Sequence, residues 1–323
     1  MRTGKRGSTD MKYYLAPMEG LTTYTFRTVW NTYYGGMDKY FTPFISNRRM
    51  NSRERNDILP DHNEGMHTVP QILTNRSDEF LALAGQLADY GYTCVNLNLG
   101  CPSGTVVSRN RGAGFLSVPR ELDRFLAEIF SKCPIRISVK TRIGVEDPEE
   151  WRLLLAIYEN YPMEELIIHP RLQQEGYAGT PHMEAFAEAA SRLTCPLCYN
   201  GDITSPASLM RLRERFPNLE TVMLGRGILQ NPALLSQIKS PTSCDAELST
   251  LRAFHDTLLS RYREIMSGDT NTLYKMKDLW TFLGRSFSDA DRHLKKIKKA
   301  DSISDYKIAV GNLFRECEFH PPA

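Results

Sequence analysis

The sequence predicts an α/β fold, in which a closed barrel of eight parallel strands alternates with helices and an all-helical region follows. Eight short apolar or β-branched runs recur along residues 13–227, and helix-like stretches separate most of them. Strands that alternate with helices pair in parallel, and eight such units imply a (β/α)8 TIM barrel. The alternative is an open doubly wound sheet, but no early G-x-G-x-x-G opens a helix after the first strand.

Each expected strand ends in polar residues or glycine. The strands cover residues 13–20, 39–45, 68–73, 94–100, 135–144, 165–171, 196–203 and 221–227. Apolar periodicity predicts helices between them. These helices cover residues 77–91, 119–133, 147–161 and 205–217. Ser77 is the expected N-cap of the first helix and Gly91 its stop, and a proline opens the second.

The strand signals stop at about residue 246, and four helical segments follow. We therefore expect three parts: a disordered N-terminal arm at 1–10, the barrel at 11–240 and a helical domain at 246–323. The boundary falls in the turn-rich stretch at 240–247.

Composition excludes several classes of protein. The hydrophobic share of 41% is that of an ordinary globular chain, and a formal charge of +2 does not by itself indicate a nucleic-acid binder. Seven cysteines, an odd number, suit reduced thiols rather than a disulfide framework. The basic N-terminus lacks the apolar core of a signal peptide, and no long apolar run follows. We expect a cytoplasmic protein without membrane association.

The strand ends carry unusual polar residues, and in a barrel of this kind chemistry gathers there. In strand order these residues are Pro17, Met18 and Glu19; Gln71; Asn96, Asn98 and Cys101; Lys140 and Arg142; His169 and Arg171; Asn200, Gly201 and Asp202; and Gly225, Arg226 and Gly227.

The last two groups predict a phosphate site. Glycines let a ligand approach the backbone, and Arg226 adds a fixed cation. Each glycine cluster alone could be a bare turn, but together they lie where this fold binds phosphate. A flavin mononucleotide, FMN, would also need donors for its ring and a cation near N1 and O2, and Gln71 and Lys140 suit these roles. The alternatives are a snorkelling Lys140 and a core His169.

The stretch NLNLGCP holds a thiol at the mouth of the expected pocket. Asn96 and Asn98 share one face of the strand, and Gly100 permits a tight turn before Cys101. The thiol could be a nucleophile, although no Cys-His-Asn/Asp arrangement is evident, or a proton donor. Cys195 and Cys198 form a C-x-x-C without a second pair at zinc spacing. We interpret both as packing residues and expect no metal.

These motifs resemble those of the tRNA-dihydrouridine synthases, flavin-dependent barrels with a C-terminal helical domain. The resemblance runs from about residue 14 to 315 and rests on APMEG, Gln71, NLNLGCP, VKTRIG, H-x-R at 169–171, NGDI and LGRG, in family order. It implies reduction of uridine to 5,6-dihydrouridine in tRNA, with hydride from reduced FMN to C6 and a proton from Cys101 to C5. NADPH, or NADH, is the implied reductant.

The resemblance also implies roles for individual residues. The implied cofactor-binding residues are Pro17, Met18, Glu19, Gln71, Lys140, His169, Asn200, Gly201, Asp202, Gly225 and Arg226. The implied substrate contacts are Asn98, Arg142 and Arg171. The run RHLKKIKK places Arg292, Lys295, Lys296 and Lys299 on one helical face, where contact with RNA phosphate competes with a merely solvated face. The expected partner is tRNA, and the chain is expected to act as a monomer.

Two positions depart from the family pattern: Gly104 replaces a common lysine, and Leu172 replaces Thr or Ser. Both face RNA in the family, so the departures concern the target: a different tRNA position or another RNA. Two alternatives to the family function stay open, namely an FMN barrel that reduces a free small molecule and a non-catalytic RNA-binding protein on a relict barrel.

Overall fold

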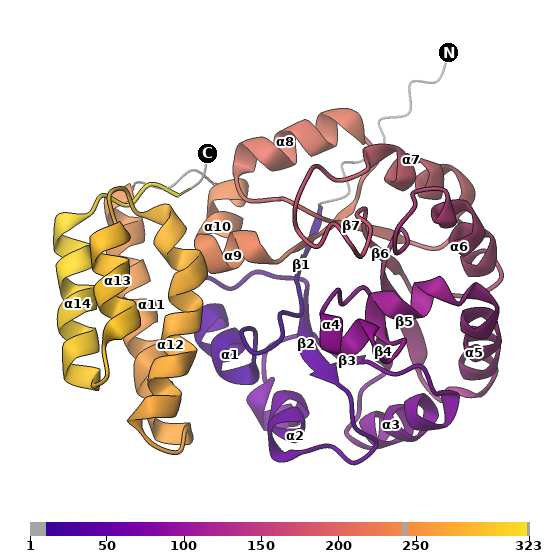
Figure 1. The fold of residues 1–323 in the computed structure, drawn as a ribbon, viewed down its shortest axis with the longest axis horizontal. Helices are drawn as coiled ribbons and strands as arrows, with labels where there is room; N and C mark the ends of the chain where they lie inside the picture. The colour runs from indigo at the N-terminus through magenta and orange to yellow at the C-terminus, as the bar shows by residue number, and fades with distance from the viewer. Residues whose placement is uncertain (1–10, 241–243, 322–323) are drawn as a thin grey trace.

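The computed structural model describes residues 11–240 and 244–321, and the expected arm at 1–10 lies outside them. Eight strands form a closed barrel in chain order, β1 to β8, with parallel pairing throughout and β8 returning to β1. Helices surround the barrel, and a bundle formed by the helices of residues 244–316 lies beside it (Figure 1). The predicted fold class, a (β/α)8 barrel followed by helices, is confirmed.

The strands lie at β1 (Lys12–Leu15), β2 (Lys39–Ile45), β3 (Thr68–Ile72), β4 (Cys94–Leu99), β5 (Arg136–Arg142), β6 (Leu166–His169), β7 (Leu197–Asn200) and β8 (Thr221–Leu224). The α-helices of the barrel lie at α1 (Tyr24–Tyr33), α2 (Ser52–Ile58), α3 (Ser77–Asp89), α4 (Gly104–Val107), α5 (Pro119–Lys132), α6 (Glu150–Tyr158), α7 (Met183–Arg192), α8 (Pro206–Arg215), α9 (Arg226–Gln230) and α10 (Leu234–Lys239). Those of the bundle are α11 (Cys244–Ile265), α12 (Asp269–Leu283), α13 (Asp291–Lys299) and α14 (Ile303–Glu316).

Except for β2, which has the predicted bounds, the strands are shorter than the sequence pattern predicts, because the polar residues at their ends belong to loops. The clearest case is the eighth strand, which stops at Leu224 so that Arg226 can begin α9. One helix start also differs from expectation. Ser77 is the first residue of α3 rather than its N-cap, and its hydroxyl donates to Glu128.

The inside of the barrel is layered. Apolar side chains from alternate strands, such as Phe41, Ile167 and Met223, fill its middle. Below them, Glu165 accepts hydrogen bonds from the Tyr14 hydroxyl and from Lys39, which closes the bottom. The polar side chains of the strand ends therefore line only the upper part of the barrel.

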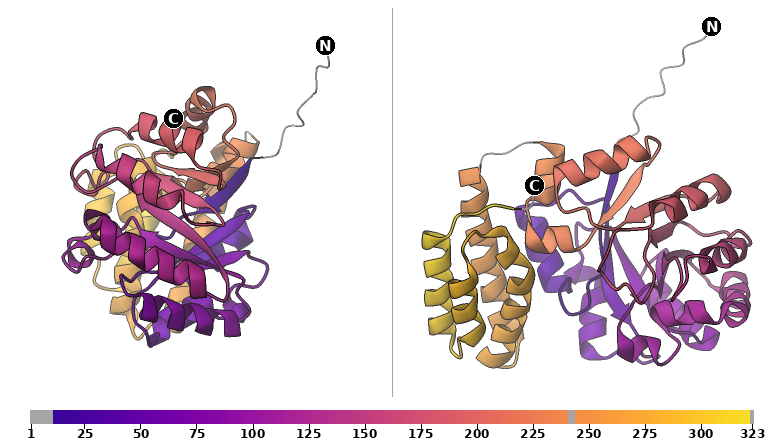
Figure 2. Two further views of the ribbon diagram at one scale, coloured as in Figure 1. Left: turned by 90° about the vertical axis from the view of Figure 1, so that its right-hand side faces the viewer. Right: turned by 45° about the horizontal axis from the view of Figure 1, so that its top comes forward.

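The helical bundle packs on the barrel through α1 and α9. Phe26 of α1 meets Phe254 of α11 edge to face, with ring centroids 5.8 Å apart. Ser286, just after α12, donates to the carbonyl of Gln230, and Lys275 of α12 donates to the carbonyl of Gly20. Figure 2 shows the bundle from two further directions, with α13 and α14 farthest from the barrel. One continuous apolar core includes residues of both parts.

Candidate functional site

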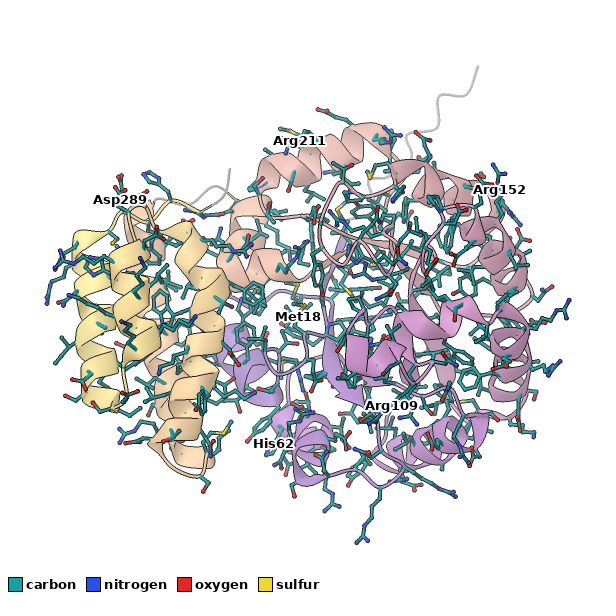
Figure 3. The ribbon with its side chains drawn as sticks, viewed as in Figure 1. Met18, His62, Arg109, Arg152, Arg211 and Asp289 are labelled. Carbon is teal, nitrogen blue, oxygen red and sulfur yellow. The ribbon has the colours of Figure 1, made fainter. Side chains whose placement is uncertain are left out.

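A cavity of about 520 Å³ opens at the C-terminal ends of the strands. All eight strands contribute to its lining, either with residues near their C-terminal ends or with residues that follow them, from Met18 after β1 to Arg226 after β8. Figure 3 labels Met18, which lies at the rim of the barrel toward the helical bundle. The cavity brings together every residue that the sequence predicted to bind the cofactor, and Cys101 as well.

The Cys101 turn is held from below by Asn98. The side-chain oxygen of Asn98 accepts hydrogen bonds from the backbone N–H groups of Gly100, at 3.0 Å, and Cys101, at 2.9 Å. An oxygen that accepts from two successive amides fixes a tight turn, because both amides must point to one place. The structure therefore gives Asn98, which was expected to contact substrate, a role in shaping this turn.

Two further residues hold the turn from its sides. Arg142 donates from Nε to the carbonyl of Gly100, at 2.9 Å, and from Nη1 to the carbonyl of Leu172, at 2.8 Å. Gly112, with φ of +56°, packs directly against Cys101, because a Cβ there would lie 2.9 Å from the Cys101 carbonyl oxygen. A side chain at residue 112 would therefore push the thiol-bearing turn out of place.

Burial keeps the thiol protonated. It raises the pKa of Cys101, and the nearby carboxylate of Glu19 adds to the rise. A neutral thiol donates a proton more readily than it acts as a nucleophile at neutral pH. Of the two roles that the sequence left open for Cys101, the electrostatics of the site favour the proton donor.

Lys140 lines the cavity as a cation without a carboxylate partner among the residues that the structure describes. Burial lowers its pKa to about 8, and the neighbouring Arg142 adds to the effect. The other groups that act on it are the thiols of Cys198 and Cys101. An ammonium group left without a carboxylate in a cavity is costly for the empty protein, and it is suited to an anionic or electron-rich ligand.

Asp202, which follows β7, lies between the guanidinium groups of Arg171, which follows β6, and Arg226, which follows β8. Arg226 donates to its Oδ1 at 2.6 Å, and Arg171 contacts both carboxylate oxygens. Arg226 also lies over the ring of Tyr177, 4.3 Å from the centroid. Two cations and one anion leave one net positive charge, beside the backbone of Gly201.

His169 is neutral. Burial lowers its pKa well below the ordinary value, and Arg142 and Lys140 add to the effect. Its Nε2 lies 3.1 Å from Nη1 of Arg171, and a guanidinium can only donate, so Nε2 accepts and the ring proton is on Nδ1.

Arg142 and Arg171, both expected to contact substrate, are 1% exposed. Arg171 donates to the carbonyls of Ala178 and Gly179 besides Asp202, and it is not among the described residues that line the cavity. Arg142 does line the cavity, and the contact of both arginines with substrate stays a prediction.

The sequence reasoning missed two residues of the site. Tyr177 lines the cavity and its ring faces Arg226, Arg142 and His169. Gly112 supports Cys101. The pair of glycines in RGAG (111–114) was a usable signal for the second, whereas nothing near Tyr177 in the sequence marks it.

The predicted basic face on α13 forms. Arg292, Lys295, Lys296 and Lys299 are exposed, while His293 and Ile297 are buried against the bundle. α13 lies on the side of the bundle away from the barrel (Figure 1). Its contact with RNA stays a prediction.

Among the described residues, no three His, Cys, Asp or Glu side chains gather where they could hold a metal ion. In the same part of the chain, no helix combines the length and apolarity needed to cross a membrane.

A barrel with a thiol, an unpartnered lysine and an arginine–aspartate cluster around one cavity at its strand ends has the build of a barrel enzyme. The family model for dihydrouridine synthase (Dus) matches residues 14–300. The chain therefore belongs to the dihydrouridine synthase family.

Two curated relatives illustrate the match. The tRNA-dihydrouridine(16) synthase of Pseudomonas putida is 28% identical over 316 residues, which cover 93% of this chain and 97% of the relative. The tRNA-dihydrouridine synthase B of Pasteurella multocida is 27% identical and covers 72% of this chain and 71% of its own.

Solved structures share the fold alone. Morphinone reductase has a TM-score of 0.51 at 12% identity and covers 72% of this chain and 86% of its own. An old yellow enzyme homologue from Zymomonas mobilis has a TM-score of 0.52 at 11% identity, with 72% and 90% covered.

Proposed function

We propose that this protein reduces uridine to 5,6-dihydrouridine in tRNA, with FMN as its resident cofactor and NADPH, or NADH, as the source of reducing equivalents. Family membership supports the reaction class. The single observation that carries the assignment to this cavity is the neutral thiol of Cys101. It shares the cavity with Lys140, a cation that pairs with no carboxylate in the described part of the chain.

The cavity fits FMN at both ends. The net positive charge of the Arg171–Asp202–Arg226 cluster suits a phosphate, and the glycines beside it keep the backbone accessible. A Cβ on Gly225 would lie 3.3 Å from Ala16 and 3.7 Å from the Met18 sulfur, so this position is a narrow part of the cradle. Asn200 lies next to the cluster and lines the cavity.

The deeper end of the cavity supplies polar groups for the ring. Lys140 offers its ammonium group and Gln71 an amide, and both line the cavity. Pro17, Met18 and Glu19 border the same space, with Glu19 tied to Arg53 at 2.7 Å. Bound reduced flavin would supply the hydride for C6 of the uracil.

The chain's own residues have two tasks in the reaction. Cys101 holds a proton and gives it to C5, so that the hydride and the proton together saturate the C5–C6 bond. Asn98, Arg142 and Gly112 keep the thiol in position before the substrate arrives. The neutral His169 adds no further positive charge to a cavity that already contains Lys140.

The exposed basic face of α13 supports an RNA substrate, because the reduction of a free pyrimidine would not need these cations. The target uridine must leave its stack to enter a cavity of this depth. We propose the exposed Arg292, Lys295, Lys296 and Lys299 as contacts to the RNA backbone.

The experiment is to map dihydrouridine in RNA from cells with and without this protein. One tRNA position should lose the modification, and position 16 is the first to examine, because the Pseudomonas putida relative is named for it. A purified enzyme that reduces free uridine as well as it reduces tRNA would contradict the proposal, as would an unchanged map.

A further inference from the structure

Four buried side chains form a continuous row of hydrogen bonds under the Cys101 turn. Asn96 Nδ2 donates to the Ser138 hydroxyl, Gln71 Nε2 donates to Asn96 Oδ1, and Asn98 Nδ2 donates to Gln71 Oε1, each at 2.8 Å. Asn98 Oδ1 then accepts from the backbone N–H of Cys101. Ser138, Asn96 and Gln71 are 0% exposed and Asn98 is 7% exposed.

The direction of this row follows from chemistry. A backbone N–H can only donate, so the Asn98 atom that faces it must be the oxygen, and the Asn98 amide nitrogen must face Gln71. The same reasoning fixes the orientation of Gln71 and then of Asn96. Ser138 is the last member of the row. Its hydroxyl donates to the Val95 carbonyl, at 3.4 Å, which leaves its oxygen to accept from Asn96.

We propose that Asn96 and Ser138 are positioning residues for the Cys101 thiol, although neither is part of its turn. Together they hold Gln71 in the one orientation that directs the Asn98 oxygen to the turn. This inference rests on the proposed function in taking Cys101 as the proton donor. A donor must lie within hydrogen-bond reach of the atom it protonates, so a loosened turn reduces the rate even when the thiol is present.

The register of the strands supports a role beyond simple packing. Asn96 pairs with Ser138 across β4 and β5 and with Gln71 across β3 and β4, so the row crosses three adjacent strands at one level. Thr42 of β2 extends this level to a fourth strand, because its hydroxyl accepts from the Gln71 backbone N–H. An apolar side chain at residue 96 would pack at this level but would leave Gln71 without its acceptor.

The test compares Ser138→Ala and Asn96→Leu with two controls. Ser138→Thr keeps the hydroxyl. Thr141→Val removes another buried hydroxyl from β5, one that bonds to the Arg142 carbonyl and to Tyr158 and takes no part in the row. The readout is the rate of alkylation of Cys101 by iodoacetamide across pH, followed by peptide mass spectrometry, with Cys133 as internal reference.

In both test variants we expect the pH midpoint of Cys101 alkylation to fall, because a loosened turn exposes the thiol to water. The kcat on tRNA should fall about tenfold while KM stays within about twofold. Cys133 should not change, Ser138→Thr should restore the wild-type profile, and Thr141→Val should keep it. If the pH profile of Cys101 alkylation is unchanged in Ser138→Ala, the inference is wrong. This result decides the question even if Asn96→Leu does not fold.

The alkylation profile separates this inference from the proposed function. If wild-type protein does not reduce uridine in tRNA, the proposed function fails, and the profile still decides whether the row positions the thiol. If wild-type protein reduces tRNA and both test variants match it in profile and in kcat, the inference fails and the proposed function stands.

Discussion

The guanidinium group of Arg226 lies 2.6 Å from the carboxylate of Asp202, which Arg171 contacts from the other side. The carboxylate thus keeps two cations close together that would otherwise repel each other. For the flavin phosphate proposed above, Arg226 would be the cation that lines the cavity, and Asp202 already holds it in place.

Removing Arg226 should therefore weaken flavin retention. In Arg226→Ala, Asp202 still pairs with Arg171, so the cluster loses its net positive charge and a charge-assisted contact of about 1.5–3 kcal/mol. Dialysis followed by absorbance at 450 nm measures the flavin that remains. The matched control is Arg213→Ala on α8, an exposed arginine away from the cavity. Equal retention in Arg226→Ala and wild type, or a cofactor that is FAD alone, would contradict the proposed phosphate site.

Replacing Cys101 should separate cofactor chemistry from substrate chemistry. Cys101→Ala should retain FMN and still oxidise NADPH, while uridine reduction falls by about 10²–10⁴-fold for loss of a positioned acid. Cys101→Ser should recover little, because a hydroxyl has a much higher pKa than a thiol. Single-turnover formation of dihydrouridine is the measurement.

Cys94→Ala is the matched control for that experiment. Cys94 is 7% exposed and packs inside the barrel, so its loss should reduce stability and leave the chemistry intact. A Cys101→Ala protein that reduces tRNA at near the wild-type rate would remove the thiol from the mechanism.

We expect Lys140 to lower the stability of the flavin-free protein while it strengthens flavin binding. Its folded-state pKa of about 8 lies below the ordinary value of 10.5, so the unfolded chain binds the proton more tightly, and the contribution of Lys140 to stability should rise between pH 8 and 10.5. Below pH 8 the buried charge destabilises the flavin-free protein. Lys140→Met should therefore raise the free energy of unfolding at pH 7 by about 2 kcal/mol and weaken flavin binding.

Urea unfolding of the flavin-free protein across pH checks this prediction. From pH 8 to pH 10, the free energy of unfolding of wild type should increase relative to that of Lys140→Met, because the two proteins share their other titrating groups. A wild-type profile that falls through this range, with no difference between the two proteins, would mean that Lys140 is solvated rather than held in the cavity.

The basic face of α13 can be tested by charge reversal. Lys295→Glu with Lys296→Glu should weaken tRNA binding and flatten its dependence on salt, because fewer counterions are released. The flavin spectrum and NADPH oxidation without RNA should not change. The double reversal Arg211→Glu with Arg213→Glu on α8 makes the same change of charge away from the bundle (Figure 3). If tRNA binding depends on salt equally in the two double variants, the basic face of α13 is solvated and does not contact RNA.

Much of the fold could be predicted from the sequence because each strand is a local apolar pattern followed by a polar break. The positions of these polar breaks also predicted where the cavity lies, because the parallel strands of a barrel all end on the same side. The ends of the elements were less predictable. Arg226 looks like the end of a strand in sequence but begins a helix.

The partners of the polar side chains could not be predicted. Asn98 and Arg142 have the residue types of substrate contacts, and in the structure Asn98 Oδ1 and Arg142 Nε also bind the backbone of the Cys101 turn. Tyr177 is eight residues beyond the end of β6, and only the closed barrel brings it to Arg226. Such pairings depend on long-range geometry, whereas apolar periodicity is a local property.

The aromatic contact between Phe26 of α1 and Phe254 of α11 has a consequence for how the molecule unfolds. A chain that ended at residue 240 would leave the outer side of α1, with Phe26 and Tyr33, exposed to water. The barrel and the bundle are therefore expected to melt in one transition. A ligand that binds only the bundle would then also stabilise the cavity against unfolding, because the Lys275 side chain bonds the bundle to the Gly20 carbonyl at the rim of the barrel.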